Sequence, residues 1–107
     1  MKLEGLRVLD LSLFLPGPQL SLMMADQGAE VIKVEPPGEG EPNRHIGPRI
    51  GENSVFFRNT HRGKKSVCIN LKSPAGREAL LKLCETVDVF LEAFRPGVVD
   101  RLGLGYE

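Results

Sequence analysis

The sequence contains no tryptophan, one tyrosine and two cysteines, and its 14 lysine and arginine residues are balanced by 14 aspartate and glutamate residues. A neutral chain with few aromatic rings lacks the basic surface and the stacking platforms that nucleic-acid-binding proteins use, so we expect no nucleic-acid partner. No stretch approaches the roughly 18 consecutive apolar residues of a membrane-spanning helix, and the first residues do not form the apolar core of a signal peptide. We therefore expect a cytoplasmic protein that does not enter a membrane.

The sequence also has little with which to build a disulfide, a metal centre or a serine-hydrolase site. Cys68 and Cys84 do not show CxxC spacing, and we interpret both as reduced core thiols. His45 and His61 have no cysteine or carboxylate at the spacing of a zinc site. The G-x-S-x-G turn that carries the nucleophile of α/β-hydrolases is absent as well.

Strand-like and helix-like segments alternate along the chain. Apolar runs predict strands, and they lie at residues 6–12, 30–35, 66–71 and 88–94. A helix is predicted between the first two strands, with Pro18 in its first turn and Leu20, Met23 and Met24 on its buried face. Another is predicted between the last two strands, with Ser73 as its N-cap; its core-facing residues would be Leu80, Leu81, Cys84 and Val87. This order predicts an α/β domain with a mostly parallel sheet.

The remaining segments are less regular. Residues 36–54 are rich in glycine, proline and charge and predict a long surface loop, while residues 55–59 fit a short helix or a strand equally well. A short helix is predicted from about Val98. Residues 105–107 resemble the lead-in to another helix, so we expect the chain to be a fragment of a longer protein.

Ligands of open α/β sheets bind beyond the carboxyl ends of the strands. Four segments that are polar or rich in proline and glycine reach those ends, at residues 12–18, 35–40, 70–73 and 92–97. They predict a ligand-binding rim, although crossover turns without a ligand have the same composition. The first of these turns, SLFLPGPQL, lacks the GxGxxG pattern. NAD binding, which the acid Glu35 at the end of the second strand would suit, is therefore only a minor alternative.

Cations flank the third strand on both sides. Lys64 and Lys65 precede it and Lys72 follows it, so the two groups should lie roughly 20 Å apart and cannot share one phosphate site. Arg101 is the residue expected to join Lys72 at the carboxyl rim. The cations before the strand are expected to make structural or dimer contacts.

The joint occurrence of GAEVIKVEPPG, RGKKSVCINLK and FRPGVVDRLGLGYE resembles the amino-terminal part of class III CoA-transferases. This family includes formyl-CoA transferase, carnitine CoA-transferase and α-methylacyl-CoA racemase. The resemblance implies a Rossmann-like, mostly parallel sheet with helices on both faces. It also implies that residues 1–107 form the amino-terminal, CoA-binding portion of the large domain of an interlocked homodimer.

The resemblance further implies which residues contact CoA, which is a substrate here and not a covalently bound cofactor. They come from the turns after the strands and from the last short helix, and they are Leu15, Pro16, Ile69, Asn70, Leu71, Lys72, Ala93, Phe94, Arg95 and Arg101. The chain departs from the family pattern at Pro36, where some members have an arginine that packs on adenine. Arg44 or Arg49 could replace that arginine, or the adenine could be held differently. At Ala93 many transferases have asparagine.

The activity implied is CoA transfer between an acyl-CoA and a carboxylic acid, through a mixed anhydride and a thioester on an aspartate. That aspartate would lie beyond residue 107, so no catalytic residue is assigned in this chain and the chain alone is expected to be inactive. Asp10 and Glu35 are expected to cap and anchor loops. The long ENSVFFRNTHRGKKS segment favours a transferase over a racemase. The chain could instead be a catalytically inactive CoA-binding fragment or a purely structural domain.

Overall fold

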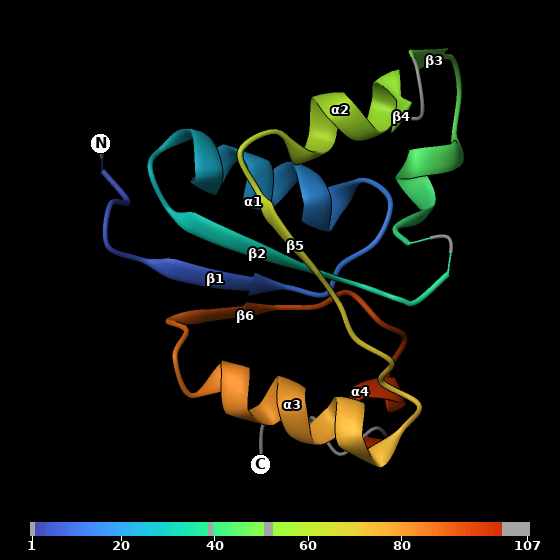
Figure 1. Cartoon of the computed structure of the whole chain (residues 1–107). Helices are drawn as coiled ribbons and strands as arrows, with labels where there is room; N and C mark the ends of the chain where they lie inside the picture. Colours follow the sequence, from blue (N-terminus) through green and yellow to red (C-terminus); the bar gives the residue numbers. More distant parts are fainter. Residues whose placement is uncertain (1, 39, 51–52, 102–107) are drawn as a thin grey trace.

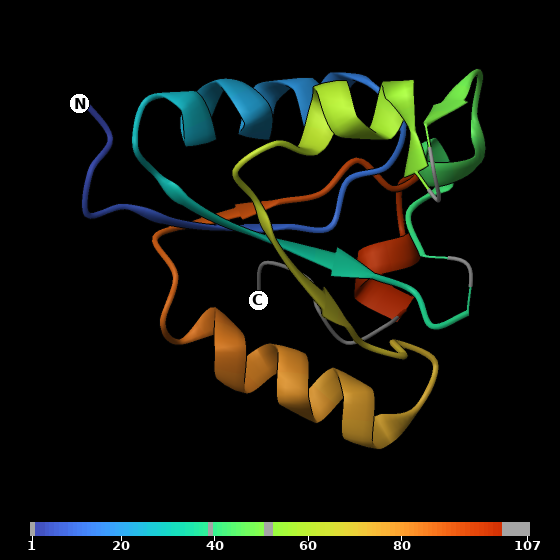
Figure 2. The same cartoon turned by 45° about the horizontal axis from the view of Figure 1, so that its top comes forward.

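The computed structural model describes residues 2–38, 40–50 and 53–101. Four parallel strands form a sheet in the order β5-β2-β1-β6, with β1 at Arg7–Asp10, β2 at Glu30–Glu35, β5 at Lys65–Cys68 and β6 at Val89–Leu91. Helices α1 (Pro16–Asp26) and α2 (Val55–His61) lie on one side of the sheet, and α3 (Pro74–Cys84) lies on the other (Figure 1). The view in Figure 2 shows the same three layers. The predicted parallel sheet with helices on both faces is thus confirmed.

The alternation of side chains along β1 and β2 gives the two faces of the sheet different contents. Successive residues of a strand point to opposite faces, and Leu9, Leu11 and Val34 form an apolar core with Leu80 of α3. On the α1 side, Val8 and Val31 form a smaller apolar cluster. The residues that follow them on that side are charged: Asp10 and Lys33 are paired in the parallel register and both are buried. The core therefore lies mainly between the sheet and α3.

Helix α3 begins and pairs as the sequence predicts. The Ser73 hydroxyl accepts a hydrogen bond from the Gly76 main-chain N–H, and Lys82 lies 3.9 Å from Glu78 one turn away. The predicted buried face is right except at one residue: Leu80 is fully buried and Cys84 and Val87 pack against the core, whereas Leu81 is 47% exposed.

Helix α1 begins at Pro16, two residues before Pro18, and its predicted buried face is wrong at Leu20 and Met23, which are exposed. Met24 is half-buried against the Val8 and Val31 cluster, as predicted. The fully buried residues of the helix are Gly17, Pro18, Ser21 and Leu22. The physical reason is a polar anchor: the Ser21 hydroxyl donates to the buried Asp10 carboxylate. At Gly17 a β-carbon would come within 2.1 Å of the Ser12 β-carbon, so only glycine permits this close approach of helix and strand end.

Residues 36–54 are more ordered than the predicted loop. They contain the 3₁₀ helix η1 (Pro42–His45) and the antiparallel pair β3 (Arg49–Ile50) and β4 (Asn53–Ser54). Residues 55–59, which fitted either a helix or a strand, belong to α2, whose first turn is capped by Ser54. The short helix α4 (Val98–Arg101) lies where it was predicted. The predicted lead-in at residues 105–107 lies outside the described residues.

The two cysteines do not both lie in the core. Cys68, at the end of the edge strand β5, is exposed, which contradicts its prediction as a core thiol. Cys84 is half-buried on α3, where burial raises the pKa of its thiol. In the part of the chain that the structure describes, no helix is long and apolar enough to cross a membrane.

Candidate functional site

A cavity of about 450 Å³ opens at the carboxyl ends of the strands, where the sheet topology predicts a ligand. Four parts of the chain line it: Leu11 and Leu13 after β1, residues 34–37 at the end of β2, residues 69–72 after β5, and Phe94 with Val98 after β6. Most of these side chains are apolar; Glu35, Asn70 and Lys72 are the polar ones. A pocket of this kind can take a flat or elongated apolar group and hold an anion at its edge.

The turn from Asn70 to Ser73 is held rigidly on one side of this pocket. Its Asn70 side chain accepts a hydrogen bond from the Lys72 main-chain N–H at 3.0 Å, and the Ser73 hydroxyl donates to the Asn70 carbonyl at 3.1 Å. Arg77 of α3 donates to the carbonyl of Leu71 at 3.0 Å. The contacts leave the Lys72 side chain exposed and able to meet a ligand phosphate.

Glu35, at the end of β2, is fully engaged within the protein. Arg44 of η1 donates to its two oxygens at 2.7 and 2.8 Å, and the Ser66 hydroxyl and the Glu41 main-chain N–H donate as well. The Arg44 hydrogen bonds lower the pKa of Glu35 to about 2, against the opposing effect of burial. A carboxylate held in this way is not available to a ribose hydroxyl, which weakens the NAD alternative further.

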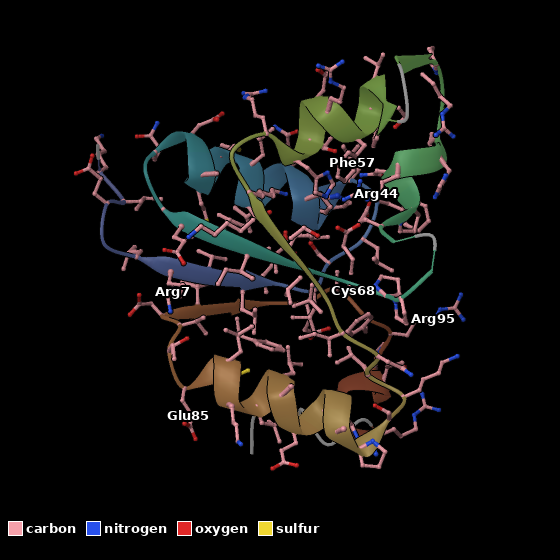
Figure 3. All side chains as sticks on the ribbon, viewed as in Figure 1. Arg7, Arg44, Phe57, Cys68, Glu85 and Arg95 are labelled. Carbon is pink, nitrogen blue, oxygen red and sulfur yellow. The ribbon has the colours of Figure 1, made fainter. Side chains whose placement is uncertain are left out.

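Arg44 is committed to the same cluster. Its guanidinium lies 3.9 Å from the centre of the Phe57 ring, and Phe57 in turn stacks on His61 (Figure 3). Arg44 therefore points toward Glu35 and α2, on the α1 side of the sheet. It does not line the pocket, so it does not stand where an adenine-packing arginine would be needed.

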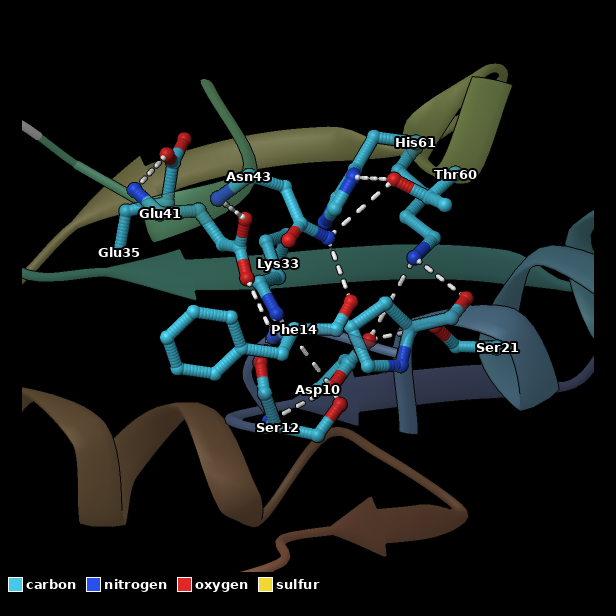
Figure 4. Close-up of polar contacts among 12 residues, drawn as sticks. Asp10, Ser12, Phe14, Ser21, Lys33, Glu35, Glu41, Asn43, Thr60 and His61 are labelled. Atoms are coloured by element: carbon cyan, nitrogen blue, oxygen red, sulfur yellow. Dashed lines mark hydrogen bonds and ion pairs between the residues drawn. The ribbon is translucent and has the colours of Figure 1, made fainter. Parts of the chain in front are cut away.

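A buried cluster of charged groups lies behind the turn between β1 and α1 (Figure 4). Lys33 and Lys64 place their ammonium groups 3.9 and 3.6 Å from the two Asp10 oxygens, and all three side chains are at most 2% exposed. Lys33 donates to the Ser12 carbonyl, and Lys64 donates to the Pro18 carbonyl at 3.0 Å. The cluster thus ties the strand ends to the turn and to the first turn of α1.

Burial and pairing act against each other in this cluster. Burial would raise the pKa of Asp10, but Lys33 and the hydroxyls of Ser12 and Ser21 lower it overall. Burial lowers the pKa of Lys33, and it lowers the pKa of Lys64 to about 8 although Asp10 opposes the shift. The expectation that Asp10 anchors a loop agrees with these contacts.

Comparison with known proteins decides the family. A family model described as CoA-transferase family III matches residues 3–107. The chain belongs to CoA-transferase family III. It is 45% identical over 104 residues to the acetyl-CoA:oxalate CoA-transferase of Acetobacter aceti, a match that covers 97% of this chain and 27% of that protein. It is 43% identical over 106 residues to the human succinyl-CoA:glutarate CoA-transferase, covering 98% of this chain and 24% of that one.

A solved structure supports the same placement. The crystal structure of a CAIB/BAIF family protein from Brucella suis matches with a TM-score of 0.90 and 37% identity, over 97% of this chain and 29% of that one. This family III chain therefore spans about a quarter of the length of the curated relatives it matches. In those relatives and in that structure, it corresponds to the amino-terminal part.

Half of the predicted CoA-contacting residues come together in the family III chain. Ile69, Asn70, Leu71, Lys72 and Phe94 line the pocket. Leu15 occupies the N-cap position of α1 without a capping hydrogen bond, Pro16 begins the helix, and neither lines the cavity. The others that do not line it are Ala93, Arg95 and Arg101.

Two of these residues lie in other surroundings. Arg95 points away from the protein (Figure 3), and Arg101 donates to the Gly97 carbonyl at 3.2 Å within α4. The segments predicted as the ligand-binding rim also supply Leu13, Glu35, Pro36 and Pro37, and the lining residues that no prediction included are Leu11, Val34 and Val98. Leu11 and Leu13 continue the every-second-residue pattern that begins at Leu9 of β1, and Val34 has the matching position on β2. This alternation could have identified them.

The cations just before β5 and at its first residue are accounted for without a ligand. Lys64 is buried against Asp10, Arg62 pairs with Asp26 at 2.8 Å, and Lys65 pairs with Glu30 at 3.6 Å. None of the three lines the pocket.

Proposed function

We propose that this chain forms the CoA-binding part of an acyl-CoA transferase and that CoA enters the pocket at the carboxyl ends of the strands. The observation that carries the proposal is the convergence of residues 69–72 and Phe94 on one largely apolar cavity of about 450 Å³. Relatives over 40% identical carry the name of acyl-CoA-dependent CoA-transferases. CoA combines an apolar ring and arm with phosphate groups, which suits a pocket of apolar walls and a cationic edge.

In this proposal Ile69, Leu71 and Phe94 contact the apolar parts of CoA. Pro36 and Pro37 lie in the wall of the pocket and hold the adenine by apolar contact, since Arg44 is held by Glu35. Lys72 and Arg101 are the cations proposed for the phosphates, because both are exposed and both follow strand ends.

The transfer step itself is assigned to residues outside this chain. An aspartate would attack the acyl-CoA carbonyl and release CoA as thiolate, leaving a mixed anhydride on the enzyme. The thiolate would then attack the aspartyl carbonyl of that anhydride and expel the donor acid as its carboxylate, which leaves an enzyme thioester. The acceptor carboxylate would attack this thioester, release CoA thiolate and form a second mixed anhydride. Attack of the thiolate on the acceptor's acyl carbonyl would give the new acyl-CoA and free the aspartate. We propose an interlocked homodimer for the intact protein, in line with the family resemblance. The 107-residue chain by itself is expected to produce no turnover.

The test is calorimetric titration of CoA into the intact protein that carries this chain, at two salt concentrations. Arg101→Ala is expected to weaken CoA affinity about tenfold or more, because a charge-assisted contact contributes roughly 1.5–3 kcal/mol. Lys72→Ala is expected to have a smaller effect that shrinks at high salt, since an exposed ammonium group is screened.

Lys65→Ala is the matched control, because Lys65 pairs with Glu30 at the end of the sheet opposite to the pocket. It should leave CoA affinity unchanged. A loss for Lys65→Ala as large as that for Arg101→Ala would place the phosphates at the basic run before β5 and contradict the proposed site.

A further inference from the structure

Phe14 has a backbone conformation that residues with a side chain rarely adopt. Its φ is 65°, and among the described residues it is the one non-glycine residue with positive φ. The β-carbon makes this left-handed region unfavourable, and glycine is the usual residue there. Such an outlier persists only when its surroundings impose it, and it occurs most often at functional sites. Phe14 lies in the turn between β1 and α1, directly after the pocket residue Leu13.

Two buried side chains from a distant part of the chain impose this conformation (Figure 4). Glu41 accepts a hydrogen bond from the Phe14 main-chain N–H at 2.9 Å, and the side-chain amide of Asn43 donates to the Phe14 carbonyl. Glu41 and Asn43 are both fully buried. Both polar groups of the Phe14 main chain are thus bound by the segment that follows β2, 27 and 29 residues further along the chain.

The pair of side chains is itself fixed. The second Glu41 oxygen accepts from the Asn43 main-chain N–H, which closes the first turn of η1. The Asn43 carbonyl accepts from the hydroxyl of Ser54, the residue that caps α2. A shift of Glu41 or Asn43 would therefore have to disturb η1 and the start of α2, so the pair can hold the turn against its own conformational preference.

We infer that Glu41 and Asn43 are positioning residues that hold the β1–α1 turn in its ligand-binding shape by fixing Phe14 at positive φ. The inference rests on the proposed function, because the turn carries Leu13, which lines the pocket, and the predicted CoA contacts Leu15 and Pro16. Without the two side chains, Phe14 returns to negative φ and the residues on either side of it are displaced. The segment after β2 thereby controls the turn after β1.

A thermodynamic cycle with glycine at position 14 tests this inference. Glu41→Gln keeps the size of the side chain but turns an amide N–H₂ group toward main-chain N–H donors. Phe14→Gly removes the conformational penalty, whereas Phe14→Ala removes the ring and keeps the penalty. Glu78→Gln, at an exposed carboxylate on α3, is the control substitution. The measurements are CoA affinity by calorimetry, and KM and kcat of the transferase reaction, on the intact protein.

We expect Glu41→Gln to weaken CoA affinity about tenfold in the otherwise unchanged protein and by no more than about twofold in the Phe14→Gly background. In the Phe14→Ala background the tenfold loss should remain. KM for the acyl-CoA should rise more than kcat falls, and Glu78→Gln should change neither. If Glu41→Gln does not fold, Asn43→Ala, which removes the donor to the Phe14 carbonyl, takes its place in the same cycle.

Equal losses in the unchanged, Phe14→Gly and Phe14→Ala backgrounds would assign Glu41 a general structural role and overturn the inference. So would unchanged affinity of the Glu41→Gln protein while the unsubstituted protein binds CoA. Failure of the unsubstituted protein to bind CoA would overturn the proposed function and, with it, this inference.

Discussion

On the α3 side of the sheet, Leu9, Leu11, Val34 and Leu80 form an apolar core that continues into the open pocket at the carboxyl ends of the strands. On the α1 side, the same strands point charged residues into the interior, and Asp10 and Lys33 are at most 2% exposed, like the leucines of the core. The difference is chemical and also geometric. Apolar contacts are non-directional, whereas each buried polar group needs a partner at a defined distance and angle.

The charged side of the sheet is therefore the side that can specify the shape of a turn. Asp10 and Lys33 contact Ser12 in the turn after β1, and Glu41 contacts Phe14 of that turn as well as Glu35 at the end of β2, so buried charged groups bind the turns after both strands. Replacement of a buried ion pair by apolar residues is often neutral or stabilising, so stability alone does not explain why charges occupy these positions. The need to fix the positions of the turns does explain why charges occupy them.

The largest expected effect comes from Asp10→Asn, which removes the negative charge between two buried ammonium groups. Leaving Lys33 and Lys64 without that carboxylate should lower the free energy of unfolding by about 3–5 kcal/mol, the usual result of breaking a buried pair from one side. Urea denaturation of the chain measures it. The exposed pair of Glu78 and Lys82 is the control, and Glu78→Gln should have little measurable effect. Similar small losses for both variants would contradict the contrast between buried and surface charge.

The apolar side of the sheet could be predicted from the sequence and the charged side could not. Alternation and β-branched residues identify β1 and β2, and Ser73 followed by Pro74 identifies the start of α3, because these signals are local. The burial of Lys33 is not visible locally: a lysine in a strand is ordinarily at a surface, and its partners Asp10 and Ser12 lie more than 20 residues away. The wrong face predicted for α1 has the same origin, since Ser21 turns inward only because Asp10 is there to accept its hydrogen bond.

The candidate site likewise has features that could be predicted from the sequence and features that could not. Residues 69–72 and Phe94 could be predicted because the family motifs fall on them, and the rule that ligands bind beyond strand ends agrees. The hold of Glu41 and Asn43 on Phe14 could not, because it joins two turns through side-chain hydrogen bonds across 27 and 29 residues.

An effect of intermediate size is expected from acid. The pKa of Glu35 is lowered from its ordinary 4.5 to about 2, so its ionised form is favoured in the folded protein and contributes stability above pH 4.5. That contribution, roughly 3 kcal/mol, is lost as the pH falls from about 4.5 through 2. The unfolding free energy, followed by urea denaturation across this range, should decrease with a slope that Glu35→Gln reduces, while the lowered pKa of Asp10 leaves part of the decrease in place.

The comparison with Glu35→Gln is needed because His61 also responds to acid. Burial lowers the pKa of His61 to about 4, so the unfolded chain binds a proton more readily and stability falls between about pH 6.5 and 4. The histidine acts mainly above pH 4 and the carboxylate mainly below 4.5. If the acid-induced loss below pH 4 is the same with glutamine at position 35, the Arg44–Glu35 contact does not stabilise the fold as described.

The smallest effect tests the apolar side, at the point where α3 approaches the pocket. A β-carbon at Gly76 would come within 1.9 Å of the Asn70 carbonyl oxygen, a main-chain atom that cannot move without shifting the turn at residues 70–73. Gly76→Ala should therefore destabilise the chain by about 1–3 kcal/mol, as overpacking generally does. At an unhindered helix position the same substitution would stabilise by roughly 0.5–1 kcal/mol, so the sign of the change is diagnostic.

Ala79→Gly supplies the matched control, because Ala79 is exposed in the same helix and its replacement measures helix propensity alone. Urea denaturation gives both values, and both variants should be less stable than the parent chain for different reasons. In the intact protein only Gly76→Ala should also weaken CoA binding, because only it displaces Asn70 in the pocket wall. A stabilising Gly76→Ala would mean that α3 does not press on Asn70, and the apolar side would then leave the turn after β5 unspecified.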